Sequence, residues 1–520
     1  MSGFAMVHAR ALNGLQAASV QVEVHLANGL PSFTLVGLAD TEVKEARERV
    51  RSALQNSGLE FPSNKRITVN LAPADLPKDS GRFDLPIALG ILAASGQIDA
   101  SALAAYEFAG ELSLAGDLRP VRGALAMCLA LQGAGVVGTS PGSLVLPEVS
   151  AQEAALVPGA RVYGAKHLLD VVRQFAPEGS AAVGDAHVAI SSGWARVQSQ
   201  PQVGAAVYPD LADVKGQAVA KRALEIAAAG GHSMLLVGPP GAGKSMLAQR
   251  FAGLLPPMTL DESLQSAALA SLVGRLQLAH WGQRPTSAPH HSASAPALVG
   301  GGSPPRPGEI SMAHNGVLFL DEMPEFPRSA LEALREPLES GTITISRAAR
   351  RAEFPARFQL IGAMNPCPCG FLGSNQKQCR CTPDQIARYQ NKLSGPLLDR
   401  IDLHVEVPAL PASELLQAAP SETSAAVGER VAQARQRAME RQGKTNQALQ
   451  GKEIDLHCAT DEPSRKFLQT AATRLAWSAR GTHRSLKLAR TIADLSGAQA
   501  VQLVHIAEAM QYRRALHALR

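Results

Sequence analysis

Aromatic residues and cysteines are scarce in this chain of 520 residues: Phe, Trp and Tyr make up 4% of it, and only six residues are Cys. So few cysteines in so long a chain exclude the disulfide framework of small secreted proteins. Also missing are an apolar run long enough to cross a bilayer and an N-terminal basic segment followed by an apolar one. We therefore expect a cytoplasmic protein without a membrane partner.

Net charge is low as well. The 50 Lys and Arg residues are nearly balanced by 45 Asp and Glu residues, which leaves a formal charge of +5. Such a mild excess neither indicates nor excludes nucleic-acid binding, so any basic surface has to be local. Apolar residues, by contrast, make up 46% of the chain. This share excludes a disordered protein and provides cores for about two to four domains.

The most informative motif is a glycine-rich loop that follows an apolar run. Met234–Val237 is typical of a buried strand, and the eight residues after it have the phosphate-loop pattern: Gly238, Pro239, Pro240, Gly241, Ala242, Gly243, Lys244 and Ser245. The glycines let backbone N–H groups turn toward phosphate oxygens, Lys244 adds a positive charge, and Ser245 offers a hydroxyl to Mg²⁺. The motif predicts a nucleotide site for ATP and Mg²⁺.

A second apolar run ends in two acids. Gly316–Leu320 is apolar throughout, as a buried parallel strand is, and Asp321 and Glu322 follow it. Parallel strands deliver ligands at their carboxyl ends, where Asp321 can hold the Mg²⁺ that Ser245 contacts and Glu322 can deprotonate a water. A pair of acids at the start of a helix is the structural alternative. Beside a phosphate loop, the pair favours ATP hydrolysis over nucleotide binding alone.

The chain is of the α/β class and divides into four segments. Strand-like and helical stretches alternate in residues 1–170, which predicts an α/β domain, and residues 171–205 have the Gly-, Ala- and Ser-rich composition of a linker. Residues 206–410 hold the phosphate loop and the strands of a parallel sheet, with a Pro-, Ser- and His-rich insert at 275–310. Residues 411–520 have helical spacing and no strand-like alternation, which predicts a helical lid.

Four of the six cysteines are clustered. Cys367 and Cys369 form one Cys-x-Cys pair, and Cys379 and Cys381 form a second one nine residues later. Two tight turns of this kind can bring four thiolates around one Zn²⁺. Redox disulfides and free structural cysteines are the alternatives. We expect zinc.

Taken together, these motifs resemble the magnesium-chelatase-like group of AAA+ ATPases, and within it the ComM family. Further stretches carry the resemblance along the chain: Pro289–Ser294, Leu298–Gly302, Pro307–Ser311, Asn365–Gly370, Gly395–Asp402 and Ala489–Asp494. The resemblance implies an AAA+ core with a helical lid and assembly into a homo-hexamer. It also implies an ATP-driven DNA motor, a helicase that promotes branch migration and integration of incoming DNA during natural transformation, with recombination proteins as possible partners.

Further polar residues are candidates for the hydrolytic site. Asn365 follows an apolar strand-like run, so that its amide can bond the attacking water or the γ-phosphate, and the family has its sensor at this position. An Asn-Pro turn is the alternative. In the C-terminal helices Arg480 is our candidate for the lid arginine that senses the γ-phosphate, with Arg484 second, although surface arginines are common on helices.

Arg400 is our candidate for an arginine finger. This planar cation would come from a neighbouring subunit and stabilise charge that develops on the phosphoryl oxygens. The alternative is a salt bridge to Asp399 or Asp402. A finger that acts in trans requires a ring, so we expect a lone subunit to hydrolyse ATP poorly.

Contacts with DNA are predicted at a basic turn. Arg347, Arg350 and Arg351 lie between the strand-like segments Thr342–Ile345 and Arg357–Leu360, which predicts a hairpin whose tip contacts phosphates. The alternative is a solvated charged turn. The insert adds a second set of pore candidates, for which a role in an ordinary loop is the alternative: Arg284, His290, His291 and Arg306.

The N-terminal segment resembles the proteolytic domain of Lon-type proteases through Leu76–Asp79, Gly110–Gly116 and Pro120–Gly123. By this resemblance Arg82 stands in place of the nucleophilic serine, and Leu125 in place of its activating lysine. Acyl transfer needs both groups, so we expect a domain without protease activity. Ring assembly or DNA contact is its expected role.

A rival function is open at this point. A magnesium-chelatase-type ATPase that remodels a protein partner would have the same nucleotide site. Stimulation of ATP hydrolysis by DNA favours the motor, whereas stimulation only by a protein favours the rival.

Overall fold

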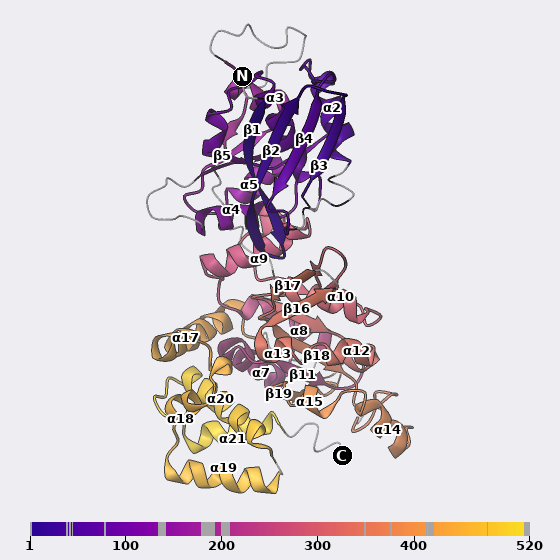
Figure 1. The fold of residues 1–520 in the computed structure, drawn as a ribbon. Coiled ribbons are helices and arrows are strands. Elements are labelled where there is room, and N and C mark those ends of the chain that lie inside the picture. Colours follow the sequence, from indigo (N-terminus) through magenta and orange to yellow (C-terminus); the bar gives the residue numbers. More distant parts are fainter. Residues whose placement is uncertain are drawn as a thin grey trace.

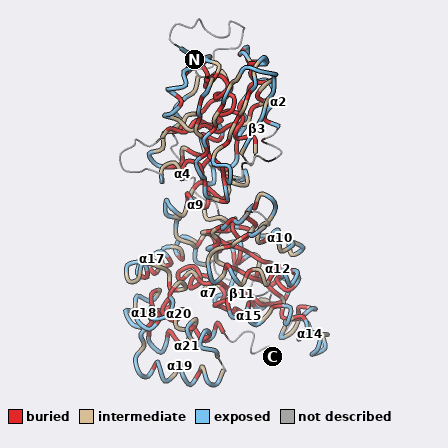
Figure 2. The backbone as a smooth tube through the Cα atoms, viewed as in Figure 1, coloured by how far each residue is buried: buried red, intermediate tan, exposed pale blue. Residues whose placement is uncertain are grey.

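The computed structural model describes three parts of the chain: an N-terminal domain, a central domain and a C-terminal helical domain (Figure 1). The residues that it describes are 3–37, 40, 43, 45–76, 78, 80–133, 142–177, 193–198, 208–347, 350–374, 377–411, 413, 421–475 and 477–513. Buried backbone is concentrated at the sheet of the N-terminal domain and at that of the central domain (Figure 2). None of the helices in these ranges is long and apolar enough to cross a membrane.

The N-terminal domain is built on an eight-stranded sheet of order β10-β9-β8-β5-β1-β2-β4-β3. At its centre a long antiparallel hairpin pairs Phe4 with His25, and the alternating residues Val20, Val22 and Val24 are buried. The strands are β1 (Phe4–Asn13), β2 (Gln16–Ala27), β3 (Ser32–Val36), β4 (Arg66–Ala72), β5 (Tyr106–Phe108), β8 (Ser143–Pro147), β9 (Val162–Ala165) and β10 (Ala195–Arg196), besides the short hairpin of β6 (Glu111–Leu112) and β7 (Leu118–Arg119).

Helices cover this sheet. Every residue of α3 (Asp84–Ala94) is buried, because the helix is apolar all round and packs against β1 and β2. The others are α2 (Ala46–Asn56), α4 (Ala124–Gly133), α5 (Glu148–Ala154) and α6 (Leu168–Val172). The α/β class expected for this part of the chain is confirmed.

The predicted linker, residues 171–205, differs from the structure. Phe175 is buried, and Trp194 stacks on Tyr163 with ring centroids 4.8 Å apart. Just after Trp194, β10 adds an edge strand beside β9. The described parts of the predicted linker, 171–177 and 193–198, therefore belong to the N-terminal domain, because aromatic contacts between distant residues leave no mark on local composition. Residues 178–192 and 199–207 lie outside the described residues.

The central domain has a five-stranded parallel sheet of order β12-β15-β18-β11-β19. Its strands are β12 (Thr286–Ser287), β15 (Val317–Leu320), β18 (Gln359–Met364), β11 (Met234–Val237) and β19 (Leu403–Glu406). Met234 pairs with Ile361 on one side and with Leu403 on the other, so the carboxyl ends of these strands share one edge. Because β12 is the edge strand, part of the predicted insert, 275–310, belongs to the sheet itself.

Short helices surround this sheet. They are α7 (Ala218–Gly230), α8 (Lys244–Phe251), α9 (Leu260–Leu272), α10 (Ala295–Val299), α11 (Glu309–Met312), α12 (Arg328–Glu332), α13 (Pro337–Ser340), α14 (Pro383–Gln390) and α15 (Gly395–Leu398). The insert also contributes a small hairpin of β13 (Gly300–Gly301) and β14 (Arg306–Pro307).

The predicted basic hairpin exists, but the residues predicted for its second strand were wrong. β16 (Thr342–Arg347) pairs with β17 (Arg350–Pro355), whereas the predicted partner Arg357–Leu360 runs into the core strand β18. The reason is burial, since Ala352 and Phe354 face the core at alternate positions.

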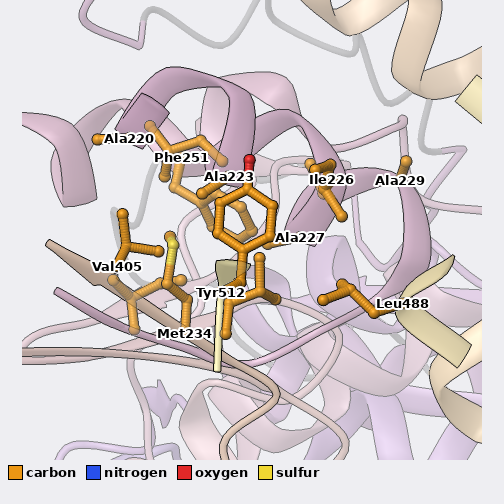
Figure 3. Close-up of a cluster of buried hydrophobic side chains, with 14 of the residues drawn as sticks. Ala220, Ala223, Ile226, Ala227, Ala229, Met234, Phe251, Val405, Leu488 and Tyr512 are labelled. Atoms are coloured by element: carbon orange, nitrogen blue, oxygen red, sulfur yellow. The ribbon is translucent and has the colours of Figure 1, made fainter. Parts of the chain in front are cut away.

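The C-terminal domain is helical in its described residues and packs on the central sheet. Its helices are α17 (Ser424–Gln442), α18 (Lys452–His457), α19 (Glu462–Arg474), α20 (Ala479–Leu495) and α21 (Leu503–Gln511). Figure 3 shows part of the joint, a buried cluster that contains Tyr512 and Leu488 of α20 together with Met234 and Val405 of the sheet. One buried apolar cluster thus fixes these helices against the strand that leads to the phosphate loop.

A buried charge strengthens the same joint. Arg484 of α20 donates to Asp402, just before β19, at 2.6 Å, and His232 lies 3.2 Å from the other carboxylate oxygen. Burial alone would raise the pKa of Asp402, but the charge of Arg484 and the contact with His232 hold it well below its ordinary value. Arg484, our second candidate for the lid arginine, is therefore engaged in holding the domain in place.

The N-terminal domain docks on α9 and on the β16–β17 hairpin. Apolar side chains from both domains share one buried cluster, in which Leu125 and Leu264 take part. The backbone N–H of Gly123 donates to the Ser271 carbonyl at 3.1 Å, and the Asn13 amide donates to the Arg351 carbonyl at 3.2 Å. The junction is therefore a packed interface with specific hydrogen bonds.

Candidate nucleotide site and neighbouring clusters

The phosphate loop connects β11 to α8, as its motif predicts. Gly241 and Gly243 have φ of 76° and 92°, in the left-handed region that glycine adopts without strain. A cavity of about 380 Å³ opens at the loop, and its lining includes Lys244, Ser245, Asp321, Glu322 and Asn365. The structure therefore brings together, at the carboxyl edge of the sheet, residues that three separate strands deliver.

Lys244 is held in place by oxygens. Its ammonium group donates to the carbonyls of Gly238 and Pro239 at 2.7 and 2.9 Å and to the Asn365 side chain at 3.1 Å. Burial lowers the pKa of Lys244 below its ordinary value, while Asp321 and Glu322 oppose this shift. The contact with Asn365 places the predicted sensor beside the predicted phosphate ligand.

Ser245 and Asp321 meet at the position predicted for Mg²⁺. The Ser245 hydroxyl donates to the Asp321 carboxylate at 2.6 Å. A hydroxyl and a carboxylate are oxygen ligands of the kind that Mg²⁺ takes together with waters and phosphates. The donor set therefore fits the predicted ion.

Glu322 has a strained backbone and an unpredicted partner. Its φ of 49° and ψ of 43° lie in the left-handed region, which costs a non-glycine residue about 1–3 kcal/mol. Its carboxylate lies 3.2 Å from Nδ1 of His291, whose ring is 4.1 Å from that of His290. The insert therefore reaches the hydrolytic site, and the paired histidines were the one sequence signal that could have indicated it.

The two arginines predicted to act in hydrolysis, Arg400 and Arg480, share one carboxylate partner and do not line the cavity. Arg400 donates to one carboxylate oxygen of Glu339 at 2.7 Å, and Arg480 lies 2.8 Å from the other. The hydrogen bond from Arg400 and the charges of both arginines lower the pKa of Glu339 below its ordinary value. Glu339, rather than Asp399 or Asp402, is therefore the partner of Arg400.

This arginine pair lies at the other end of the sheet from the phosphate loop. Arg400 comes just before β19, whose first residue Leu403 pairs in parallel with Met234, the first residue of β11. The loop follows the last residue of β11, Val237, so a four-residue strand of about 10 Å separates the two levels. The side chain of Arg480 is 52% exposed at this end of the sheet.

The four clustered cysteines converge. Their sulfur atoms all lie within 4.8 Å of one another. Cys367 is 3.4 Å from Cys369 and 3.7 Å from Cys379, and Cys369 is 3.6 Å from Cys379. Four sulfurs at about 2.3 Å from one zinc ion would be about 3.8 Å apart, so the arrangement fits a tetrahedral site.

The predicted DNA residues are only partly described. The main chains of Arg347 and Arg350 pair across the hairpin, but their side chains lie outside the described residues. Arg351 is exposed at the junction with the N-terminal domain. In the insert, Arg284 is engaged by the Asn315 carbonyl at 2.7 Å and by Glu262 at 3.1 Å, which gives it a structural role.

The central domain has a parallel sheet with a phosphate loop, two carboxylates and an asparagine at one edge, and it is joined to a helical domain. This combination defines a phosphate-loop nucleotide-binding protein of the AAA+ class. Comparison with known proteins agrees. The family model described as magnesium chelatase, subunit ChlI, matches residues 210–415. Two further models, for subunit ChlI of Mg-chelatase and for the ChlI C-terminal region, match residues 22–139 and 421–513.

Several relatives match nearly the whole chain. Competence protein ComM of Haemophilus influenzae is 52% identical over 512 residues, which are 98% of this chain and 97% of the relative. The uncharacterized protein YifB is 48% identical in Salmonella typhimurium and in Escherichia coli, over 98% of this chain and 97% and 96% of those proteins. The chain therefore belongs to the ComM family of magnesium-chelatase-like AAA+ proteins.

Proposed function

We propose that this chain hydrolyses ATP to drive work on DNA, as a ring of identical subunits that is, by family resemblance, a hexamer. The observation that carries the proposal is the division of the hydrolytic groups between two ends of one sheet. Lys244, Ser245, Asp321 and Glu322 line the cavity at the carboxyl end, whereas Arg400 precedes the amino end of β19. A complete site then needs a second subunit, which supplies the arginine.

Each residue of the cavity has a distinct task in this proposal. Lys244 binds oxygens of the β- and γ-phosphates, and Ser245 and Asp321 hold Mg²⁺. That ion, when bound, neutralises charge on the phosphate oxygens. Glu322 orients a water and accepts its proton, while the Asn365 amide bonds the water or the γ-phosphate.

The DNA part of the proposal rests on the relatives. The relative that is 52% identical over 98% of the chain is named a competence protein. By extension we propose that single-stranded and branched DNA are the substrates. The motor would promote branch migration during natural transformation, together with recombination proteins. Similarity along the whole chain favours this function over remodelling of a protein partner.

An ATPase assay with single-stranded and branched DNA tests this function. We expect DNA to stimulate hydrolysis by the wild-type ring, and Arg350→Glu with Arg351→Glu to weaken DNA binding and reduce that stimulation. The salt dependence of binding should also flatten, because each lost phosphate contact removes about one released counterion.

The matched control is Arg465→Glu with Arg474→Glu, which reverses two exposed charges on α19, away from the hairpin. This control should retain DNA stimulation. A wild-type protein that neither binds DNA nor responds to it would remove the DNA motor from consideration, and stimulation by a protein alone would support the rival function.

We also propose that the four clustered cysteines hold Zn²⁺. The cluster follows Asn365 and precedes the segment that carries Arg400, so the ion would connect the strand that leads to Asn365 to the segment that carries Arg400.

Elemental analysis of protein purified without added metal should find about one zinc per chain. Cys379→Ser with Cys381→Ser should lose it and lower the melting temperature, whereas Cys458→Ser, which removes a buried cysteine outside the cluster, should keep the zinc. Metal-free wild-type protein with full ATPase activity would contradict the zinc site.

A further inference from the structure

A second cavity, of about 520 Å³, lies at the junction of the N-terminal and central domains. It is larger than the cavity of about 380 Å³ at the phosphate loop. Small-molecule sites have volumes of about 300–1,000 Å³, so a ligand of nucleotide size fits. Leu12 and Leu272, from the two domains, both line the cavity, so a ligand here would touch both.

Four arginines line this cavity and come from separate segments. Arg82 lies in the turn just before α3, Arg122 precedes α4, Arg306 lies in β14, and Arg351 lies in β17. The first two belong to the N-terminal domain and the other two to the central domain. These arginines therefore come together only because the two domains dock, and no local motif in the sequence could predict this.

Three of these guanidinium groups have no counter-ion among the residues that the structure describes. Within the described part of the chain, the side chains of Arg122, Arg306 and Arg351 make no hydrogen bond or ion pair. Two carboxylates also line the cavity, but both have other partners. Glu111 lies 3.4 Å from Arg119, outside the lining, and Asp40 accepts a hydrogen bond from the Val43 backbone at 3.0 Å. Among the described lining residues, four arginines face two carboxylates, so this part of the lining has a net positive charge.

The fourth arginine is fixed in the wall. Arg82 is 5% exposed, and its Nε donates to the Ser80 hydroxyl at 2.8 Å. Ser80 has a φ of 67°, which is strained for a residue with a side chain, and such strain is often retained where a backbone shape serves a function. A buried arginine held in place, together with three unpaired ones, suits a multiply charged oxyanion such as phosphate, whose oxygens accept bidentate hydrogen bonds from planar guanidinium groups.

We propose that this junction cavity binds a phosphate group, carried either by a small nucleotide-like molecule or by a nucleic-acid backbone. Like charges gathered between two domains oppose docking, and a phosphate neutralises them while its oxygens accept from arginines of both domains. The ligand would therefore strengthen the junction. The inference does not depend on the proposed DNA motor, since a small phosphate ligand would occupy the cavity whatever the ring acts on.

Calorimetric titration of the full chain tests the inference. Lys244→Ala serves as the background, because it removes the main cation of the phosphate loop and so isolates binding elsewhere. Inorganic pyrophosphate is the first probe and an oligothymidylate the second. We expect one pyrophosphate site per chain, and Arg122→Gln with Arg306→Gln should weaken it about tenfold or more. Both side chains are exposed, so the folded state should survive the changes.

The control is Arg465→Gln with Arg474→Gln, which removes the same charge from α19. Pyrophosphate binding that is lost in the cavity variant and kept in the control supports a small phosphate ligand. Oligothymidylate binding with that same pattern, without pyrophosphate binding, assigns the phosphate to a nucleic acid. Binding of neither probe, or equal loss in both variants, would overturn the proposal.

Discussion

Glu322→Gln should reduce ATP hydrolysis by about 100- to 10,000-fold while leaving ATP binding intact, because general-base catalysis contributes a factor of that size to the chemical step. The amide keeps the shape of the carboxylate but cannot accept the proton of the attacking water. A ring with ATP bound should therefore accumulate. Lys244→Ala should instead abolish binding, because it removes the cation of the phosphate loop, whose ammonium group donates to the Gly238 carbonyl and the Asn365 side chain.

Two measurements separate these variants: equilibrium binding of a fluorescent ATP analogue, and release of inorganic phosphate. Glu325→Gln is a suitable control, because Glu325 pairs with Lys392 outside the cavity and should leave both measurements near the wild-type values. Turnover by Glu322→Gln at the wild-type rate would show that another group activates the water.

The cavity residues could be predicted because local patterns specify them. The phosphate loop is contiguous, and Asp321, Glu322 and Asn365 each follow an apolar strand. Since the strands are parallel, their carboxyl ends lie at one edge of the sheet. The sequence alone therefore predicts that these side chains lie close together.

Contacts between distant elements could not be predicted in this way. Glu339 is 61 residues from Arg400, and local reasoning offered only the neighbouring aspartates as partners. The same limit applies to Trp194, whose stacking on Tyr163 places part of the predicted linker in the N-terminal sheet. These contacts depend on how helices and domains pack, and the pattern of one segment does not contain that information.

The hairpin shows an intermediate case. Its existence and its basic turn follow from the sequence, but its second strand begins at Arg350, not at Arg357. Both candidate strands carry apolar residues, and only the packing of Phe354 against the core decides between them. The insert was predicted as a unit, yet its β12 completes the central sheet, and His291 contacts Glu322.

The arrangement of Arg400 leads to a second large effect. In one chain this arginine pairs with Glu339 at the amino end of the sheet. In the ring that we propose, it would exchange Glu339 for a phosphate that a neighbour presents. We expect Arg400→Ala to lower hydrolysis about 1,000-fold or more, as loss of an arginine finger does, without weakening ATP binding. Glu339→Gln should keep activity, because it leaves both Arg400 and Arg480 in place and changes only the carboxylate that they share.

Mixing two inactive proteins provides the decisive measurement. Arg400→Ala subunits retain an intact phosphate loop, and Lys244→Ala subunits retain the arginine, so an interface between the two kinds contains a complete site in one orientation. We expect the mixture to regain part of the wild-type hydrolysis, at a level that follows the statistical share of such interfaces. Native mass spectrometry establishes that mixed rings form. If mixed rings form and hydrolysis stays at the level of the separate variants, Arg400 does not act across the interface, and its pairing with Glu339 is structural.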